Sequence, residues 1–163
     1  MTIDIRRIRD RLPQEIADLE SEARREGHRH VARLIDEWST GAVRFDRDGE
    51  RLLGAYANEV LAGVGGMTVE TAMSGTLRMR RFYVRPAMRE RGIGRMLAMA
   101  LLDHACCSVV TVHAGNDGAG RFWESLGFQP YGRDGHTHVL ALQHHSDDPA
   151  ASNLRRCVTP RSP

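Results

Sequence analysis

The sequence predicts a single domain of the mixed α/β (α+β) class, in which about four helices flank a mostly antiparallel sheet of about six to seven strands. The 163 residues are 41% hydrophobic and 27% charged, which is ordinary for a globular domain with a sizeable core. Strand and helix patterns follow one another in the order β-α-α-β-β-β-α-β-α-β-β. Helices therefore alternate with strands only in the second half, and the first half is predicted to form a meander.

The N-terminal part predicts one strand and two helices. Isoleucines alternate with charged residues over residues 2–8, as in a short strand. Pro13 suits the first turn of a helix, and a second helix is expected after Gly27, from about residue 28 until Gly41. The residues expected to face the core are Ile16, Leu19 and Ala23 in the first helix, and Val31, Leu34, Ile35 and Trp38 in the second.

The middle of the chain predicts a hairpin followed by a third strand. Apolar runs at 52–57 and 60–68 are separated by Asn58-Glu59, which is typical of a hairpin turn. The second run contains Gly63, Gly65 and Gly66, and glycines inside a strand indicate a bend or a close backbone approach. The next strand spans about residues 77–84 and is expected to end before Pro86.

A loop carrying Gly92 and Gly94 opens the next helix. Such a loop presents free backbone N–H groups at the positive end of the helix dipole, so it predicts an anion site, with phosphate as the favoured anion. Seven arginines and a single acid, Glu90, lie between Arg78 and Arg95, and this predicts a positive field that attracts a polyanion. The helix is apolar nearly all round, which predicts burial on two sides.

The C-terminal part predicts a central strand, a helix and a final hairpin. Residues 108–113 are β-branched without alternation, as in a central strand. Asn116 is suited to cap a helix that runs to about residue 126 and stops at Gly127. Residues 128–131 and 137–142 then form a hairpin across 133–135. We assign residues 1–142 to the domain and the polar stretch 143–163 to a disordered tail.

Composition weighs against several classes of function. The net charge of +2 is too small to argue for a nucleic-acid partner, and no apolar run approaches the length of a membrane span. The N-terminus lacks the apolar core of a signal peptide, and the three cysteines make no disulfide framework, so we expect a cytoplasmic protein without membrane contact. His136 and His138 share a strand face, but no third ligand completes a metal site.

Two segments resemble the GNAT superfamily of acyl-CoA-dependent N-acyltransferases. The first is Arg89-x-x-Gly92-x-Gly94, directly after a strand that ends FYVRP, and it is similar to the family's pyrophosphate loop. The second runs from Asn116 to Phe128 and matches the family pattern N-x-x-A-x-x-F-Y-E-x-x-G-F except at Trp123. The spacing between the segments is also that of the family. The resemblance implies the GNAT fold, in which acyl-CoA lies in a gap where the central sheet splays between the fourth and fifth strands.

The resemblance also implies a CoA site. The strand residues before Pro86 would pair with the pantetheine arm, the N–H groups of residues 90–95 would hold the pyrophosphate, and Asn116 would lie near a pantetheine amide. The implied CoA-binding residues are Phe82, Tyr83, Val84, Arg89, Glu90, Arg91, Gly92, Ile93, Gly94, Arg95 and Asn116. Simpler readings stay open: the two glycines could serve only the turn, and Asn116 only the helix cap.

The groups that would transfer protons are less clear. Many family members carry a Tyr, acting as general acid, where this chain has Trp123, and a Glu where it has Thr111 or Arg78. An indole cannot act as an acid at neutral pH. The catalytic candidates are His113, because histidine titrates near neutrality, and Tyr131. Further alternatives are the Tyr83 phenol, Glu70 acting through water, and protonation of the thiolate by solvent.

The sequence therefore predicts an N-acetyltransferase that moves an acetyl group from acetyl-CoA, a co-substrate, to a primary amine by direct attack in a ternary complex. The acceptor is a small molecule, peptide or protein, and its pocket is expected near Trp38, residues 39–45 and the hairpin at 131–136. The alternative is a non-catalytic, regulatory acyl-CoA-binding module. A basic nucleic-acid-binding domain ranks last, and a homodimer stays open.

Overall fold

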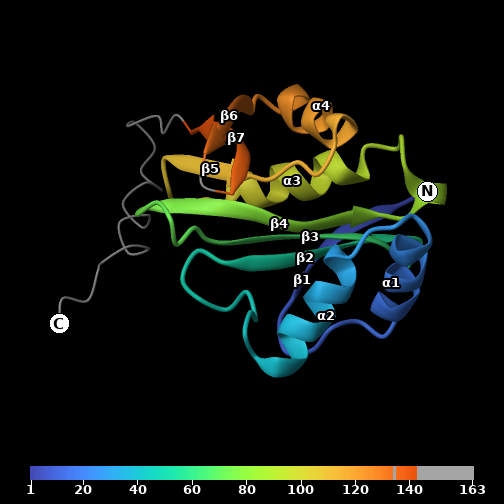
Figure 1. The fold of residues 1–163 in the computed structure, drawn as a ribbon. Coiled ribbons are helices and arrows are strands. Elements are labelled where there is room, and N and C mark those ends of the chain that lie inside the picture. The colour runs from blue at the N-terminus through green and yellow to red at the C-terminus, as the bar shows by residue number, and fades with distance from the viewer. Residues whose placement is uncertain (134, 143–163) are drawn as a thin grey trace.

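In the computed structural model, a seven-stranded sheet separates two layers of helices (Figure 1). The structure describes residues 1–133 and 135–142, so Asp134 and the predicted tail at 143–163 lie outside the described residues. Helices α1 (Ile16–Arg25) and α2 (His30–Thr40) cover one face, and α3 (Ile93–Asp103) and α4 (Asp117–Ser125) cover the other. The predicted class of fold is confirmed.

The first four strands form the predicted antiparallel meander. They are β1 (Ile3–Ile8), β2 (Arg51–Ala57), β3 (Val60–Val69) and β4 (Thr76–Val84). The β2–β3 turn places Asn58 and Glu59 at positive φ, 47° and 68°, as a two-residue hairpin turn requires. A short 3₁₀ helix, Pro86–Met88, follows β4.

The remaining strands complete the sheet in the order β1-β2-β3-β4-β5-β7-β6. Strand β5 (Val109–Val112) lies parallel to β4 after the α3 crossover and antiparallel to β7 (His136–Ala141), which pairs with β6 (Gln129–Arg133). Among the described residues, no helix is both long and apolar enough to cross a membrane.

The two central strands separate half-way along β4. Pairing between β4 and β5 stops at Met79 and Val112, so residues 80–84 of β4 are paired only with β3. A bulge lies at the same place, because Gly66 pairs with Arg80 and Val64 pairs with Tyr83. The unpaired edge of β4 is the splay that the family resemblance implied.

The glycines of β3 are explained by rings that cross the bulge. A Cβ at Gly65 would lie 2.8 Å from the ring of Phe82, and one at Gly66 would collide with Phe45. Gly65 and Gly66 need glycine because a side chain would displace an aromatic ring from the core. The predicted close backbone approach is found at Gly63, where a Cβ would lie 2.7 Å from the Tyr83 carbonyl oxygen.

Helix α3 departs from the prediction. Its inner face, Ile93, Leu97, Ala98 and Leu101, is fully buried against the sheet, but Met96 and Met99 are 38% and 40% exposed. The prediction that this helix is buried on two sides was wrong. It forms the outer layer of the molecule, and its apolar outer face is the kind of exposed apolar surface that folded proteins commonly carry.

Candidate active site

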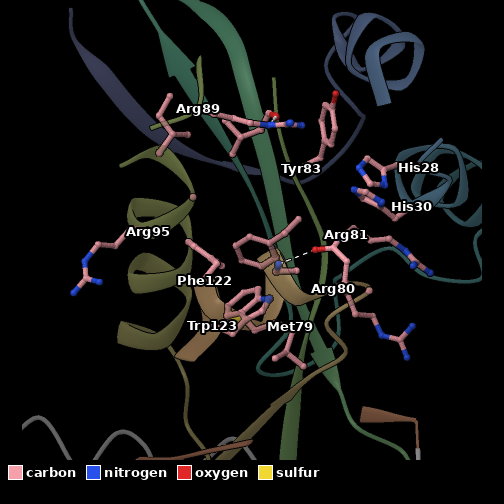
Figure 2. A pocket seen from close by; sticks show the side chains of 18 of the residues that line it. His28, His30, Met79, Arg80, Arg81, Tyr83, Arg89, Arg95, Phe122 and Trp123 are labelled. Carbon is pink, nitrogen blue, oxygen red and sulfur yellow. Dashed lines mark hydrogen bonds between the residues drawn. The ribbon is translucent and has the colours of Figure 1, made fainter. Parts of the chain in front are cut away.

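A cavity of about 800 Å³ runs along the unpaired edge of β4 (Figure 2). At one end, the loop before α3 and the first turn of that helix line it. At the other end, it reaches the connection between α1 and α2, where His28, His30 and Arg33 lie beside Arg80 and Arg81 in the cavity wall. The cavity therefore joins the predicted phosphate loop to a second polar region.

The loop end is shaped by backbone geometry. Gly92 is the N-cap of α3 and has a left-handed φ of 78°, which explains the need for glycine there. A Cβ at Gly92 would meet no atom within 4 Å, whereas a Cβ at Gly94 would lie 3.3 Å from the ring of Phe122. Both glycines thus serve the turn and its packing. Since the first N–H groups of a helix have no intrahelical acceptor, the same turn also offers donors to an anion.

Arg89 is held by helix α1 rather than left free for a phosphate. Its guanidinium donates to both carboxylate oxygens of Glu26, at 2.6 and 2.7 Å, and its Nε donates to the Val84 carbonyl at 3.0 Å. The Arg89 guanidinium, helped by the Tyr83 hydroxyl, lowers the pKa of Glu26 to about 2 despite partial burial. This bidentate pair ties the loop to α1 and balances the charge of Arg89.

Two other predicted phosphate contacts differ from each other. Arg95 lines the cavity mouth, is exposed, and has no hydrogen-bond or ion-pair partner among the described residues. In Figure 2 its side chain extends away from Phe122 and Trp123. Arg91 does not line the cavity, and its guanidinium contacts the Met1 sulfur at 3.8 Å. Arg95 is therefore the loop cation best placed to meet a ligand.

The arginine-rich stretch is less positive than its sequence predicted. Four of its seven arginines pair with acids: Arg78 with Glu70, Arg81 with Glu37, Arg85 with Glu22, and Arg89 with Glu26. The predicted field was too strong because three of these acids lie on α1 and α2, far away in the sequence. Arg80 and Arg95, which also line the cavity, have no such partner among the described residues.

The unpaired end of β4 presents backbone groups to the cavity. Arg85 donates its backbone N–H to Ala62 of β3 at 2.9 Å. Because successive N–H groups of a strand point to opposite edges, the Val84 N–H points away from β3, toward the cavity.

The side chains of Phe82 and Val84 pack in the core on the α3 side. Tyr83 faces α1, and its hydroxyl donates to Glu26 at 2.7 Å. Burial and this bond raise the pKa of Tyr83 well above its ordinary value, and the hydroxyl proton is engaged by Glu26.

Trp123 occupies an aromatic cluster instead of a proton-transfer position. Only 4% of it is exposed, and its ring makes edge contacts with Phe82, Phe122 and Phe128 at centroid distances of 4.8, 4.9 and 5.2 Å. Asn116 caps α4 by accepting from the Ala119 N–H at 2.8 Å, and it also lines the cavity. Trp123 thus shapes the wall that faces β4.

The structure separates the two predicted catalytic side chains. His113 directly follows β5, is exposed, and lines the cavity. Tyr131 lies on β6, is 46% exposed, and is not among the residues that line the cavity. Its ring stacks on that of His136 with the centroids 6.0 Å apart. Glu70 is buried, pairs with Arg78 at 3.5 Å and accepts from the Thr111 hydroxyl at 3.3 Å, also away from the cavity.

Sequence reasoning missed the residues at the other end of the cavity. His28 lies between α1 and α2, and His30 is the first residue of α2. Their ring centroids are 5.4 Å apart, and both rings approach Tyr83 (Figure 2). Their only sequence signal was a His-x-His at the start of a helix. The walls expected instead do not line the cavity: Trp38 and Phe45 are core residues, and the described residues of the hairpin, 131–133 and 135–136, are not part of its lining.

His30 is held in its neutral form. Burial lowers the pKa of His30 to about 4, and the nearby His28 and Arg81 add to the effect. Its Nε2 is buried without a hydrogen-bond partner among the described residues. Within those residues, no group of three or more His, Cys, Asp or Glu is arranged to hold a metal ion.

Comparison with known protein families and structures identifies the fold. A family model described as the acetyltransferase (GNAT) family matches residues 13–128. The chain belongs to this family. No curated protein matches the sequence significantly.

Among solved structures, a protein from Exiguobacterium sp. 255-15 assigned as an acetyltransferase is 26% identical, with a TM-score of 0.78, over 86% of this chain and 94% of that one. The PaiA N-acetyltransferase of Thermoplasma acidophilum, solved with coenzyme A, is 19% identical with a TM-score of 0.57, over 85% and 97% of the two chains.

The N-acetylglutamate synthase of Neisseria gonorrhoeae, solved with coenzyme A and N-acetyl-glutamate, is 17% identical with a TM-score of 0.67. That match covers 88% of this chain but 36% of the larger enzyme. At these identities, the last two structures show the shared fold.

Proposed function

We propose that this protein is an acetyl-CoA-dependent N-acetyltransferase that acetylates a primary amine by direct attack in a ternary complex. The observation that carries the proposal is the single cavity that joins the glycine loop before α3 to the polar region beside α2. Holding two reactants in one cavity converts a bimolecular step into an effectively unimolecular one. The family membership supports the same class of reaction.

In this proposal, acetyl-CoA lies along the splay. The N–H groups at the start of α3, between Glu90 and Arg95, receive the pyrophosphate, and Arg95 adds charge. The unpaired edge of β4, residues 82–84, pairs with the pantetheine arm as an added strand would. Asn116 lies across the cavity near the same arm. Arg89 acts indirectly, because its bonds to Glu26 and the Val84 carbonyl fix the loop.

The chemistry requires three events. The ammonium form of the amine first loses a proton to water, the neutral amine attacks the thioester carbonyl, and the proton that the nitrogen loses on forming the amide balances the one that the thiolate gains. The Val84 N–H, which points into the cavity, polarises the carbonyl oxygen in the way an oxyanion hole does. The C–S bond breaks, and the departing thiolate takes up a proton. We assign that proton to His113, since it lines the cavity and Tyr131 does not.

The competing proposal is a non-catalytic acyl-CoA-binding module. The burial of Trp123 in an aromatic cluster favours it, because the family's usual acid is replaced by a side chain that cannot donate a proton at neutral pH. The cytoplasmic location, the homodimer and the division at residue 142 stay predictions.

Release of free thiol from acetyl-CoA in the presence of a broad panel of amines separates the two proposals. The N-acetyltransferase proposal predicts amine-dependent release, with the acetylated amine detected by mass spectrometry. Calorimetric binding of acetyl-CoA without release on any amine would favour the non-catalytic module instead.

A further inference from the structure

Arg80 is an unbalanced cation in the wall of the cavity. It lies on β4 at the first position beyond the end of β5 pairing and is half-buried. Its Nε is buried and has no hydrogen-bond partner among the described residues. A buried donor without an acceptor costs free energy, and a buried charge without a counter-charge costs more.

The neighbouring charges do not relieve Arg80. Arg78 is bonded to Glu70 and the Gly135 carbonyl, and Arg81 is bonded to Glu37 through two hydrogen bonds. Glu37 and Glu70 are near enough to act on Arg80 weakly, but burial and the two flanking arginines outweigh them and lower the pKa of Arg80. The fold thus maintains a destabilised guanidinium at this place.

A second unsatisfied group faces the same cavity. The buried Nε2 of His30 has no partner among the described residues, and Arg33, on the same helix, lies exposed at the cavity wall. Figure 2 shows Arg80, Arg81 and the two histidines on the side of β4 opposite Phe122 and Trp123. This end of the cavity therefore combines one neutral imidazole with two cations that have no acid partner among the described residues, the half-buried Arg80 and the exposed Arg33.

We infer that the acetyl acceptor is an amino-carboxylate whose carboxylate is bound by the Arg80 guanidinium. The inference rests on the proposed N-acetyltransferase function and names the substrate class of the same site. A guanidinium matches the two oxygens of a carboxylate in a planar, bidentate pair. Of the two cations here that lack an acid partner among the described residues, Arg80 is the half-buried one, and its single charge matches that of one carboxylate.

The phosphates of CoA do not fill this role. Arg80 lies four residues before Val84, but the bulge makes this stretch span only three residues of β3, which is roughly 10 Å, and the glycine loop lies beyond Val84. The carboxylate would therefore bind on the α2 side of the splay while the pyrophosphate binds at the start of α3. The amine of the same acceptor would lie between the two, where the thioester is expected.

The experiment compares amines that carry an anionic group with matched amines that lack it. Glycine, β-alanine and 4-aminobutyrate are each set against their carboxamides, and O-phosphoethanolamine is set against ethanolamine. Binding to the CoA-loaded protein is measured by calorimetry, and acetylation by thiol release. We expect at least one acid to bind about 10-fold more tightly than its amide. Because binding is measured apart from turnover, loss of the charge preference and loss of transferase activity are distinguishable.

The variant Arg80→Gln tests the residue. It should weaken binding of the preferred acid about 10- to 100-fold, leave its amide within about 3-fold, and keep the affinity for acetyl-CoA. The exposed Arg25→Gln on α1, outside the cavity, is the matched control and should keep the preference. Equal binding of acids and amides by the unmodified protein, or a preference that survives in Arg80→Gln, would overturn the inference. A preference for O-phosphoethanolamine alone would overturn the carboxylate assignment.

Discussion

The two ends of the cavity are built in different ways. At the loop end, the donors are backbone N–H groups, and the chain needs Gly92 at a φ of 78° to present them. At the acceptor end, the polar groups are side chains of His28, His30 and Arg80, brought together from β4 and the α1–α2 connection. A backbone site leaves glycines at a fixed spacing in the sequence. A side-chain site leaves no such pattern, and it is where related folds can differ in substrate.

The largest expected effect comes from adding charge at the loop end. Gly92→Asp should raise the dissociation constant of acetyl-CoA about 100-fold, because its carboxylate would occupy the anion site at the start of α3. Asp and Asn both tolerate left-handed φ, so Gly92→Asn is the matched control and should lose less than about 10-fold. Calorimetry measures both affinities. If both variants lose the same affinity for acetyl-CoA, the loss comes from distortion of the turn and not from the added charge.

The next effect separates the two catalytic candidates. His113→Gln should lower kcat about 10- to 100-fold while the KM for acetyl-CoA changes little, since general acid catalysis contributes on this scale. Tyr131→Phe should leave kcat within about 2-fold, because Tyr131 lies outside the cavity wall. Steady-state kinetics with the best amine measures both. A larger loss of kcat in Tyr131→Phe than in His113→Gln would assign the role of general acid to Tyr131 instead.

A smaller effect is expected at Trp123. Trp123→Phe keeps an aromatic ring in the cluster with Phe82 and Phe122, so kcat should stay within about 3-fold while stability falls by about 1–2 kcal/mol. Urea denaturation and steady-state rates report the two quantities. A large loss of kcat with unchanged stability would show that the indole takes part in the reaction.

The smallest expected effect is the contribution of His30 to the pH dependence of the free energy of unfolding, measured without substrate. The pKa of His30 falls from an unfolded value of about 6.5 to about 4, so the unfolded chain binds more protons between these values. The contribution of the neutral imidazole is therefore fully present above pH 6.5 and is lost as the pH falls toward 4. Allowing for solvent screening, we expect the free energy of unfolding to fall by about 1–2 kcal/mol between these pH values. The variant His30→Asn should show a flatter dependence in denaturant titrations from pH 7 to 4, and an unchanged slope would contradict the assignment.

The sequence predicted the helices and strands well, and for physical reasons. The turn at Asn58-Glu59 and the stop at Gly127 need backbone conformations that few residues adopt, and these are visible locally. The partners of Arg81 and Arg89 were invisible, because Glu37 and Glu26 lie more than forty residues away and meet them only when α1 and α2 pack on the sheet. For the same reason, the acceptor walls were expected at Trp38, which lies in the core instead.

The central claim is that one cavity holds acetyl-CoA and an amine together for direct transfer. Initial rates of thiol release, measured while both substrates are varied, test it most directly. Direct attack in a ternary complex predicts intersecting double-reciprocal lines and an N-acetylated product. The rate of thiol release and the yield of that product should both be lower in Gly92→Asp. Parallel lines would indicate an acetylated enzyme intermediate, and thiol release that does not depend on any amine would contradict the transferase function itself.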